Sequence, residues 1–152
     1  MEIILTGTGS PLPDANRAGP STLVKANDIH ILIDAGRGVV MRMAGADTLP
    51  LFLRGVLITH LHSDHICDLN DVITTHWIMS QGNAPLAIYG PPGIKEFVTR
   101  QLHALEADIG YRIEHHDVLT HGPKVDVVEL APGQSFELDD VFVSTAATEH
   151  AP

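Results

Sequence analysis

The chain has 152 residues, of which 44% are hydrophobic, so it has the length and composition of one globular domain. Its formal net charge of −10 opposes unaided binding to a polyanion and suits a site that recruits cations. A single cysteine excludes an internal disulfide, and no apolar run resembles a signal peptide or a membrane span, so we expect a cytoplasmic protein with no membrane partner.

The first part of the chain is predicted to alternate short strands with turns. A proline-rich loop covers residues 11–20, and a short helix is predicted over 38–44. β-rich runs between these segments predict strands at residues 2–6, 21–25, 29–34 and 54–59. We expect the first three strands to form a small β-meander, and the fourth to run directly into a histidine-rich stretch.

Two helices and four strands are predicted after that stretch. The first helix has an apolar face at i, i+3, i+4, i+7 and i+8, and Asp68 is placed to cap it. That face consists of Leu69, Val72, Ile73, His76 and Trp77. A second helix is predicted from the apolar face Ile94, Phe97, Val98, Leu102 and Leu105. The remaining strands are predicted at residues 86–89, 126–130, 135–138 and 141–146.

The histidine-rich stretch, ITHLHSDHICDL at residues 58–69, follows a buried strand. His60, His62 and Asp64 alternate, so an extended backbone would point all three side chains to one side. His65 would point elsewhere unless the chain turns. Imidazole suits zinc and similar metals, and carboxylate also accepts harder ions. The spacing therefore predicts a metal site in which one loop contacts two neighbouring ions.

These residues resemble a known family. The string THLHSDH matches the His-x-His-x-Asp-His motif of the metallo-β-lactamase superfamily. The order of LTGTGSP, GPSTLV, LIDAGRG, YGPPG and TEHAP along the chain resembles the ribonuclease Z and arylsulfatase-like branch. The resemblance implies an α/β (α+β) fold, the αββα sandwich. Residues 1–152 would form one domain, incomplete at the C-terminus: the N-terminal half, a mixed sheet with helices on one face.

The resemblance also implies a set of metal ligands. His60, His62 and His150 would bind a first zinc ion, and Asp64 and His65 a second. The complete site would hold two Zn²⁺, with Mn²⁺ or Fe²⁺ as alternatives. Asp64 would in addition act as the general base. Asp34, in the string LIDAG, would either orient a ligating imidazole or form a turn beside Gly36.

The expected function is a zinc-dependent hydrolase similar to ribonuclease Z, in which a metal-bound hydroxide attacks a phosphodiester, with tRNA as one candidate substrate. Two rivals stay open. One is a hydrolase of small esters, of the arylsulfatase, phosphodiesterase or lactonase type, which the acidic charge favours. The other is a non-catalytic metal-binding fragment, because the resemblance implies further ligands beyond residue 152.

Other residues of the chain carry simpler interpretations. His76 is expected to be a core histidine, and Cys67 a small buried hydrophobe. The histidines at 115, 116 and 121 are expected in a solvated polar loop. The segment 90–93 is expected to form a turn and not a phosphate cradle, because two of its residues are prolines that lack an N–H group.

A half-sandwich would expose one face of its sheet. The predicted strands between residues 126 and 146 would then lack a partner layer. We therefore expect this chain to form a homo-oligomer or to associate with a C-terminal half, and to be a poor hydrolase by itself.

Overall fold

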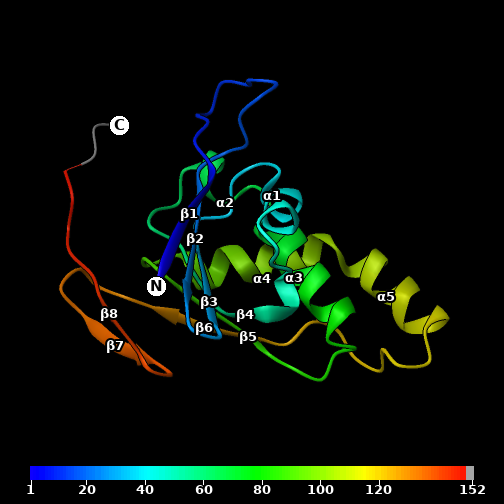
Figure 1. Ribbon diagram of the computed structural model, residues 1–152. Coiled ribbons are helices and arrows are strands. Elements are labelled where there is room, and N and C mark those ends of the chain that lie inside the picture. The colour runs from blue at the N-terminus through cyan, green and yellow to red at the C-terminus, as the bar shows by residue number, and fades with distance from the viewer. Residues whose placement is uncertain (150–152) are drawn as a thin grey trace.

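The computed structural model describes residues 1–149. They form a six-stranded sheet with helices on one face and a β-hairpin on the other (Figure 1). In spatial order the strands of the sheet are β1 (Glu2–Gly7), β2 (Ser21–Ala26), β3 (Ile29–Ile33), β4 (Leu53–Leu57), β5 (Leu86–Gly90) and β6 (Val125–Glu129). The hairpin consists of β7 (Ser135–Leu138) and β8 (Val141–Ser144). All eight predicted strands are confirmed, with ends that differ by at most two residues.

The sheet changes from antiparallel to parallel at β3. The strands β1, β2 and β3 form the predicted antiparallel meander, whereas β3 through β6 run parallel to one another. Parallel strands place their carboxyl ends at the same edge of a sheet, and the segments that follow them meet there. The segments after β3 and β4 contain Asp34 and the histidine-rich stretch, so topology brings them to one edge.

The helices connect the parallel strands and cover one face of the sheet. They are α1 (Val39–Gly45), α2 (Ser63–Ile66), α3 (Leu69–Met79), α4 (Ile94–Ala104) and α5 (Glu106–His115), with a 3₁₀ turn at Pro50–Phe52. The sequence did not predict α5, which buries none of its side chains. Arg112 donates to Asp108 one turn earlier at 2.8 Å, and such pairs stabilise a helix that has little apolar contact. The predicted polar loop is therefore wrong at His115, which ends this helix.

The hydrophobic core lies between the sheet and the helices. Side chains from the two layers interlock with almost no exposure to solvent. The sheet contributes Leu23, Leu32, Val56 and Ile88, and the helices contribute Val39, Met43, Leu69, Val72, Ile73, Ile94 and Val98. Within residues 1–149, no helix is long and apolar enough to cross a membrane.

The opposite face of the sheet is covered only in part, by the hairpin. Phe136 stacks on Tyr89 with ring centroids 4.2 Å apart. Arg54 donates two hydrogen bonds to Asp139, at 2.6 and 2.9 Å, which fastens the hairpin turn to β4. The Arg54 guanidinium beside it lowers the pKa of the Asp139 carboxyl. The hairpin thus protects the middle of this face, over β4 and β5.

The part of this face over β1 stays exposed to solvent. Ile3 pairs with Val24, which pairs with Ile31 in the next strand, so these side chains share the hairpin side of the sheet. Leu5 belongs to the neighbouring row on the same side. Ile3 and Leu5 are 62% and 68% exposed, which is unusual for large apolar side chains on a sheet.

Candidate metal centre at the end of strand β4

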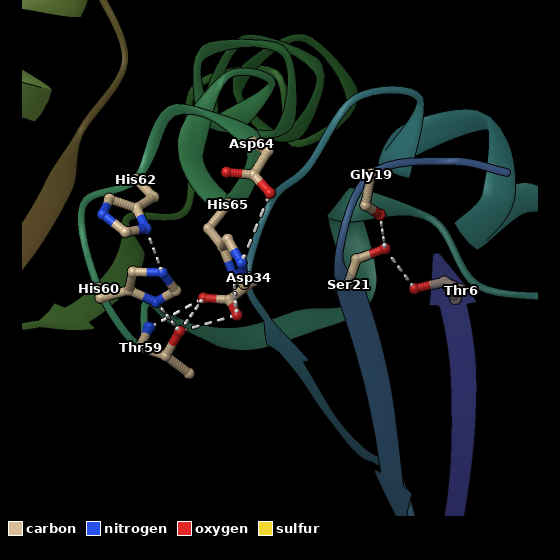
Figure 2. Close-up of polar contacts among 9 residues, drawn as sticks. All are labelled: Thr6, Gly19, Ser21, Asp34, Thr59, His60, His62, Asp64 and His65. Atoms are coloured by element: carbon tan, nitrogen blue, oxygen red, sulfur yellow. Dashed lines mark hydrogen bonds and ion pairs between the residues drawn. The ribbon is translucent and has the colours of Figure 1, made fainter. Parts of the chain in front are cut away.

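Asp34 links the ends of two neighbouring strands. Its backbone has a positive φ of 63°, which turns the chain immediately after β3. Its buried carboxylate accepts hydrogen bonds from the Thr59 backbone N–H at 2.8 Å and from the Thr59 hydroxyl at 2.9 Å. It also lies 2.7 Å from Nδ1 of His65 (Figure 2). Asp34 therefore lies in a turn and contacts an imidazole, and its role in orienting a metal-ligating imidazole stays a prediction.

The contact with Asp34 determines how His65 can act. A carboxylate that accepts a hydrogen bond from Nδ1 holds the proton on that nitrogen and leaves Nε2 as the donor atom for a metal. Nε2 of His65 lies 3.8 Å from a carboxylate oxygen of Asp64, which is itself 8% exposed. Asp64 and His65 thus form a pair of potential ligands, and Asp34 orients the imidazole of that pair through its contact with Nδ1.

His60 and His62 form a second pair beside the first. Nε2 of His60 lies 3.1 Å from Nδ1 of His62, and the two ring centroids are 4.6 Å apart. The His60 ring also lies 4.1 Å from the His65 ring. The three imidazoles therefore gather at the carboxyl end of β4 with Asp64 close by, as Figure 2 shows.

The backbone of the motif is not extended throughout. His62 has extended dihedral angles, but residues 63–66 form the helical turn α2. The prediction that an extended backbone carries Asp64 to the same side as His60 and His62 is therefore wrong in its reasoning. The turn is anchored from outside the motif, because the Ala35 N–H donates to the His65 carbonyl at 2.7 Å. This turn brings the adjacent Asp64 and His65 side chains together.

Two supporting residues were missed or misassigned from the sequence. Asp68 occupies the N-cap position of α3, but its side chain does not cap that helix. It accepts a hydrogen bond from the Gly38 N–H at 2.6 Å instead, which ties α3 to the loop after β3. No role in the site was predicted for Thr59. A hydroxyl residue between a buried strand and the first histidine was the only local signal for its role.

The other predicted residues take no part in these contacts or fall outside the described part of the chain. His150 falls outside the described residues. Burial lowers the pKa of His76, which is 3% exposed, so the predicted core histidine is confirmed. Cys67 is half-buried, and burial raises the pKa of its thiol. Residues 91–93 form a turn, with the Ile94 N–H donating to the Pro91 carbonyl at 3.1 Å, so the predicted turn is confirmed. The N–H of Gly93 is engaged by the Glu129 carboxylate.

The donor set fits a divalent transition metal by its chemistry. Within residues 1–149 no three His, Cys, Asp or Glu side chains are arranged to hold one ion. The donors instead form the two pairs described above, one of two imidazoles and one of an imidazole and a carboxylate. Neutral imidazole and carboxylate are the ligands preferred by zinc and related ions, and an imidazole backed by a carboxylate is typical of such sites.

Comparison with protein families gives a match over the whole chain. The family model described as "Anti-Pycsar protein Apyc1" matches residues 1–152. The ribonuclease Z of Mycobacterium sp. strain KMS is 51% identical over 153 residues, which cover all of this chain and 54% of that protein. The ribonuclease Z of Mycolicibacterium paratuberculosis is 49% identical and is covered to 55%. The chain therefore spans about half the length of the curated relatives it matches.

Solved structures share the fold. The metallo-β-lactamase fold protein YhfI from Bacillus subtilis superposes with a TM-score of 0.68 at 22% identity, over 93% of this chain and 50% of that one. The short form of human tRNase Z superposes with a TM-score of 0.66 at 26% identity, over 87% and 45% of the two chains. These comparisons confirm the resemblance and the fold class predicted from the sequence.

Proposed function

Because this chain belongs to the metallo-β-lactamase superfamily, in the family described as Anti-Pycsar protein Apyc1, we propose that it carries the metal-binding motif of a phosphodiester hydrolase similar to ribonuclease Z. The observation that supports this most strongly is the contact between Asp34 and Nδ1 of His65, beside Asp64. A buried carboxylate that orients an imidazole is typical of a metal-ligating histidine and not of a histidine in a solvated surface loop.

The fold and the relatives imply the use of divalent metal, and we assign the ligands as follows. His60 and His62 hold one ion together with His150. Asp64 and His65 hold a second ion, with the His65 ring oriented by Asp34. Both ions are Zn²⁺ in this proposal, because imidazoles dominate the donor set. When bound, the metal acts as a Lewis acid that makes water nucleophilic at neutral pH.

Asp64 is the residue we assign as general base. Its carboxylate is buried next to the His65 imidazole, at the carboxyl end of the parallel strands. Substrates of proteins with open α/β sheets bind at this end of the strands. A carboxylate in this position can take a proton from the attacking water. Asp34 has no such role, because its two oxygens are engaged by Thr59 and His65.

The substrate class we favour is RNA, with the 3′ region of tRNA as the specific candidate, by similarity to the ribonuclease Z relatives. One observation favours a second candidate, a small phosphodiester or other small ester. The net charge of −10 repels a polyanion, so tRNA binding would require a basic surface supplied from outside these residues.

Zinc-dependent hydrolysis is the test of this function. A chain extended to the full length of the ribonuclease Z relatives should cleave a precursor tRNA or a chromogenic phosphodiester, and a chelator should abolish turnover that added zinc restores. Cleavage of the small ester alone would favour the second candidate. If the extended chain binds zinc but cleaves neither substrate, it is a metal-binding module and the enzymatic proposal is wrong.

We further propose that the exposed face over β1 binds a partner layer, supplied either by the other half of the relatives' length or by a second copy of this chain. The isolated 152-residue chain should then self-associate, because large exposed apolar side chains on a sheet favour association. Replacing Ile3 and Leu5 with lysine should shift it to a monomer. Light scattering and sedimentation velocity would measure this.

A matched control for this experiment replaces Leu12 and Met41 with lysine. Both side chains are 78% exposed, but they lie in a loop and on α1 and not on the exposed face. That variant should associate as the original chain does. A monodisperse monomer for the unmodified chain would contradict the proposal.

A further inference from the structure

Three glycine backbones pack against one another directly beneath the α2 turn. A Cβ atom built on Gly7 would lie 1.8 Å from the carbonyl oxygen of Gly19. One built on Gly19 would lie 2.9 Å from the carbonyl carbon of Gly36, and one on Gly36 would lie 2.5 Å from the carbonyl oxygen of Asp64. We call Gly7, Gly19 and Gly36 the glycine stack. It leads from the end of β1 to a proposed metal ligand.

The glycine stack requires residues without a side chain, and it does not require residues with a positive φ. Glycines with positive φ occur elsewhere, at Gly38, Gly82, Gly93 and Gly133, whereas none of the three stack glycines has a positive φ. A positive φ is therefore not what requires glycine at position 36. What alanine could not do is fit, because the atoms it would meet belong to neighbouring backbones that cannot rotate away.

Hydrogen bonds hold the layers of the glycine stack in register. The Gly19 N–H donates to the Arg37 carbonyl at 2.8 Å, and the Gly36 N–H donates to the Pro20 carbonyl at 3.1 Å. The two loops thus exchange a pair of bonds, as two neighbouring strands do. A shift of one loop would therefore carry the other with it.

A pair of buried hydroxyls supports the stack from the side of β1. The Thr6 hydroxyl donates to the Ser21 hydroxyl at 2.8 Å, and the Ser21 hydroxyl donates to the Gly19 carbonyl at 3.3 Å (Figure 2). Both side chains are less than 10% exposed. Buried hydroxyls that satisfy one another in this way fix the position of the backbone they contact.

The top of the stack is joined to the proposed ligands. Ala35, next to Gly36, donates its N–H to the His65 carbonyl at 2.7 Å and accepts from the Asp68 N–H at 3.0 Å. The C-terminal part of α2 and the segment that follows it are therefore bonded to the same loop that carries Gly36. The position of Asp64 relative to Asp34 depends on how closely that loop approaches the turn.

We infer that Gly36 is a positioning residue that sets how deeply the Asp64–His65 turn sits against the sheet edge. The inference rests on the proposed metal site. A methyl group on Gly36 would meet the Asp64 carbonyl oxygen about 0.9 Å inside the 3.4 Å at which ordinary contact begins. Ligands must be held to within about 0.5 Å of their productive positions, so a displacement of this size weakens the site.

The test replaces Gly36 with alanine in the full 152-residue chain. We expect the affinity for Zn²⁺, measured by competition with a chromogenic chelator, to fall about 10-fold to 100-fold, the range seen when the support of a ligand is disturbed. In the metal-free chain, the imidazole ¹⁵N shifts of His65 should also change as its bond to Asp34 is displaced. Gly45→Ala is the matched control, because a Cβ on Gly45 meets nothing within 4 Å.

The possible results separate this inference from the proposed function. A folded Gly36→Ala chain with unchanged zinc affinity and unchanged His65 shifts would overturn the inference. If the unmodified chain binds no zinc, the proposed metal site fails, and altered His65 shifts in the metal-free variant would still support the positioning role.

A second measurement covers the case in which Gly36→Ala does not fold. In the unmodified chain, zinc should slow hydrogen exchange at the amides of Gly19, Ala35 and Gly36, because the stack and the ligand turn are coupled. The amide of Ile109 in α5, bonded to the Leu105 carbonyl, should not respond. Equal exchange at the stack with and without zinc would overturn the inference.

Discussion

Replacing both His60 and His62 with alanine is expected to abolish binding of the first zinc ion, the one assigned to His60, His62 and His150. The two imidazoles lie together at the end of β4, with Nε2 and Nδ1 3.1 Å apart, and they are assigned to the same ion. Their loss leaves at most one of the three proposed nitrogen ligands to that ion, which is too few for a stable zinc site. The metal content of the purified protein, measured by elemental analysis, should fall by the contribution of that ion, so that at most the ion assigned to Asp64 and His65 remains.

The control for this variant is a second pair of histidines. His115 and His116 are exposed at the end of α5 and are assigned to no ion. Replacing both with alanine removes the same number of imidazoles and should leave the metal content unchanged. The ligand assignment would be wrong if the His60 and His62 variant retained the metal content of the original chain.

Asp64→Asn is expected to reduce turnover by about 10²-fold to 10⁴-fold in a catalytically complete version of the protein, the range for loss of a general base. The substitution keeps an oxygen near His65 but removes the negative charge and the capacity to accept a proton. Metal content should fall much less than turnover. The measurement combines steady-state kinetics on a phosphodiester with elemental analysis of the same preparation.

Asp71→Asn is a suitable comparison for that experiment. Asp71 is exposed in the first turn of α3, seven positions from Asp64, and is not part of the proposed centre. Its amide variant should keep full turnover. If Asp64→Asn also showed near-normal turnover with normal metal content, Asp64 could not be the general base.

The sequence determined the local elements and the chemistry of the motif. β-rich runs bounded by turn residues predicted all eight strands, and the i, i+3, i+4 pattern predicted the core faces of α3 and α4, because both depend on neighbours within a few residues. The spacing of His60, His62, Asp64 and His65 predicted a metal site without any contact being known. The helical periodicity also predicted His76 as a core residue, since it lies on the apolar face of α3.

The sequence failed where local patterns were weak or competed. Helix α5 has no buried side chain, so no apolar periodicity in the sequence indicated it. The ion pair between Arg112 and Asp108 stabilises the helix only once it has formed. The short turn α2 was predicted as extended because the alternation of His60, His62 and Asp64 fits a strand. The turn forms because Ala35, about 30 residues earlier, supplies a partner for the His65 carbonyl.

Only the tertiary structure decided how the site is supported. Asp34 and His65 are 31 residues apart in the chain, yet their side chains meet because β3 and β4 are parallel neighbours that end at one edge. Asp68 contacts Gly38 and does not cap α3, and Gly36 approaches Asp64 through backbone atoms alone. Contacts between residues so far apart leave no periodic trace in a single sequence, because each depends on the packing of several elements and not on the identity of near neighbours.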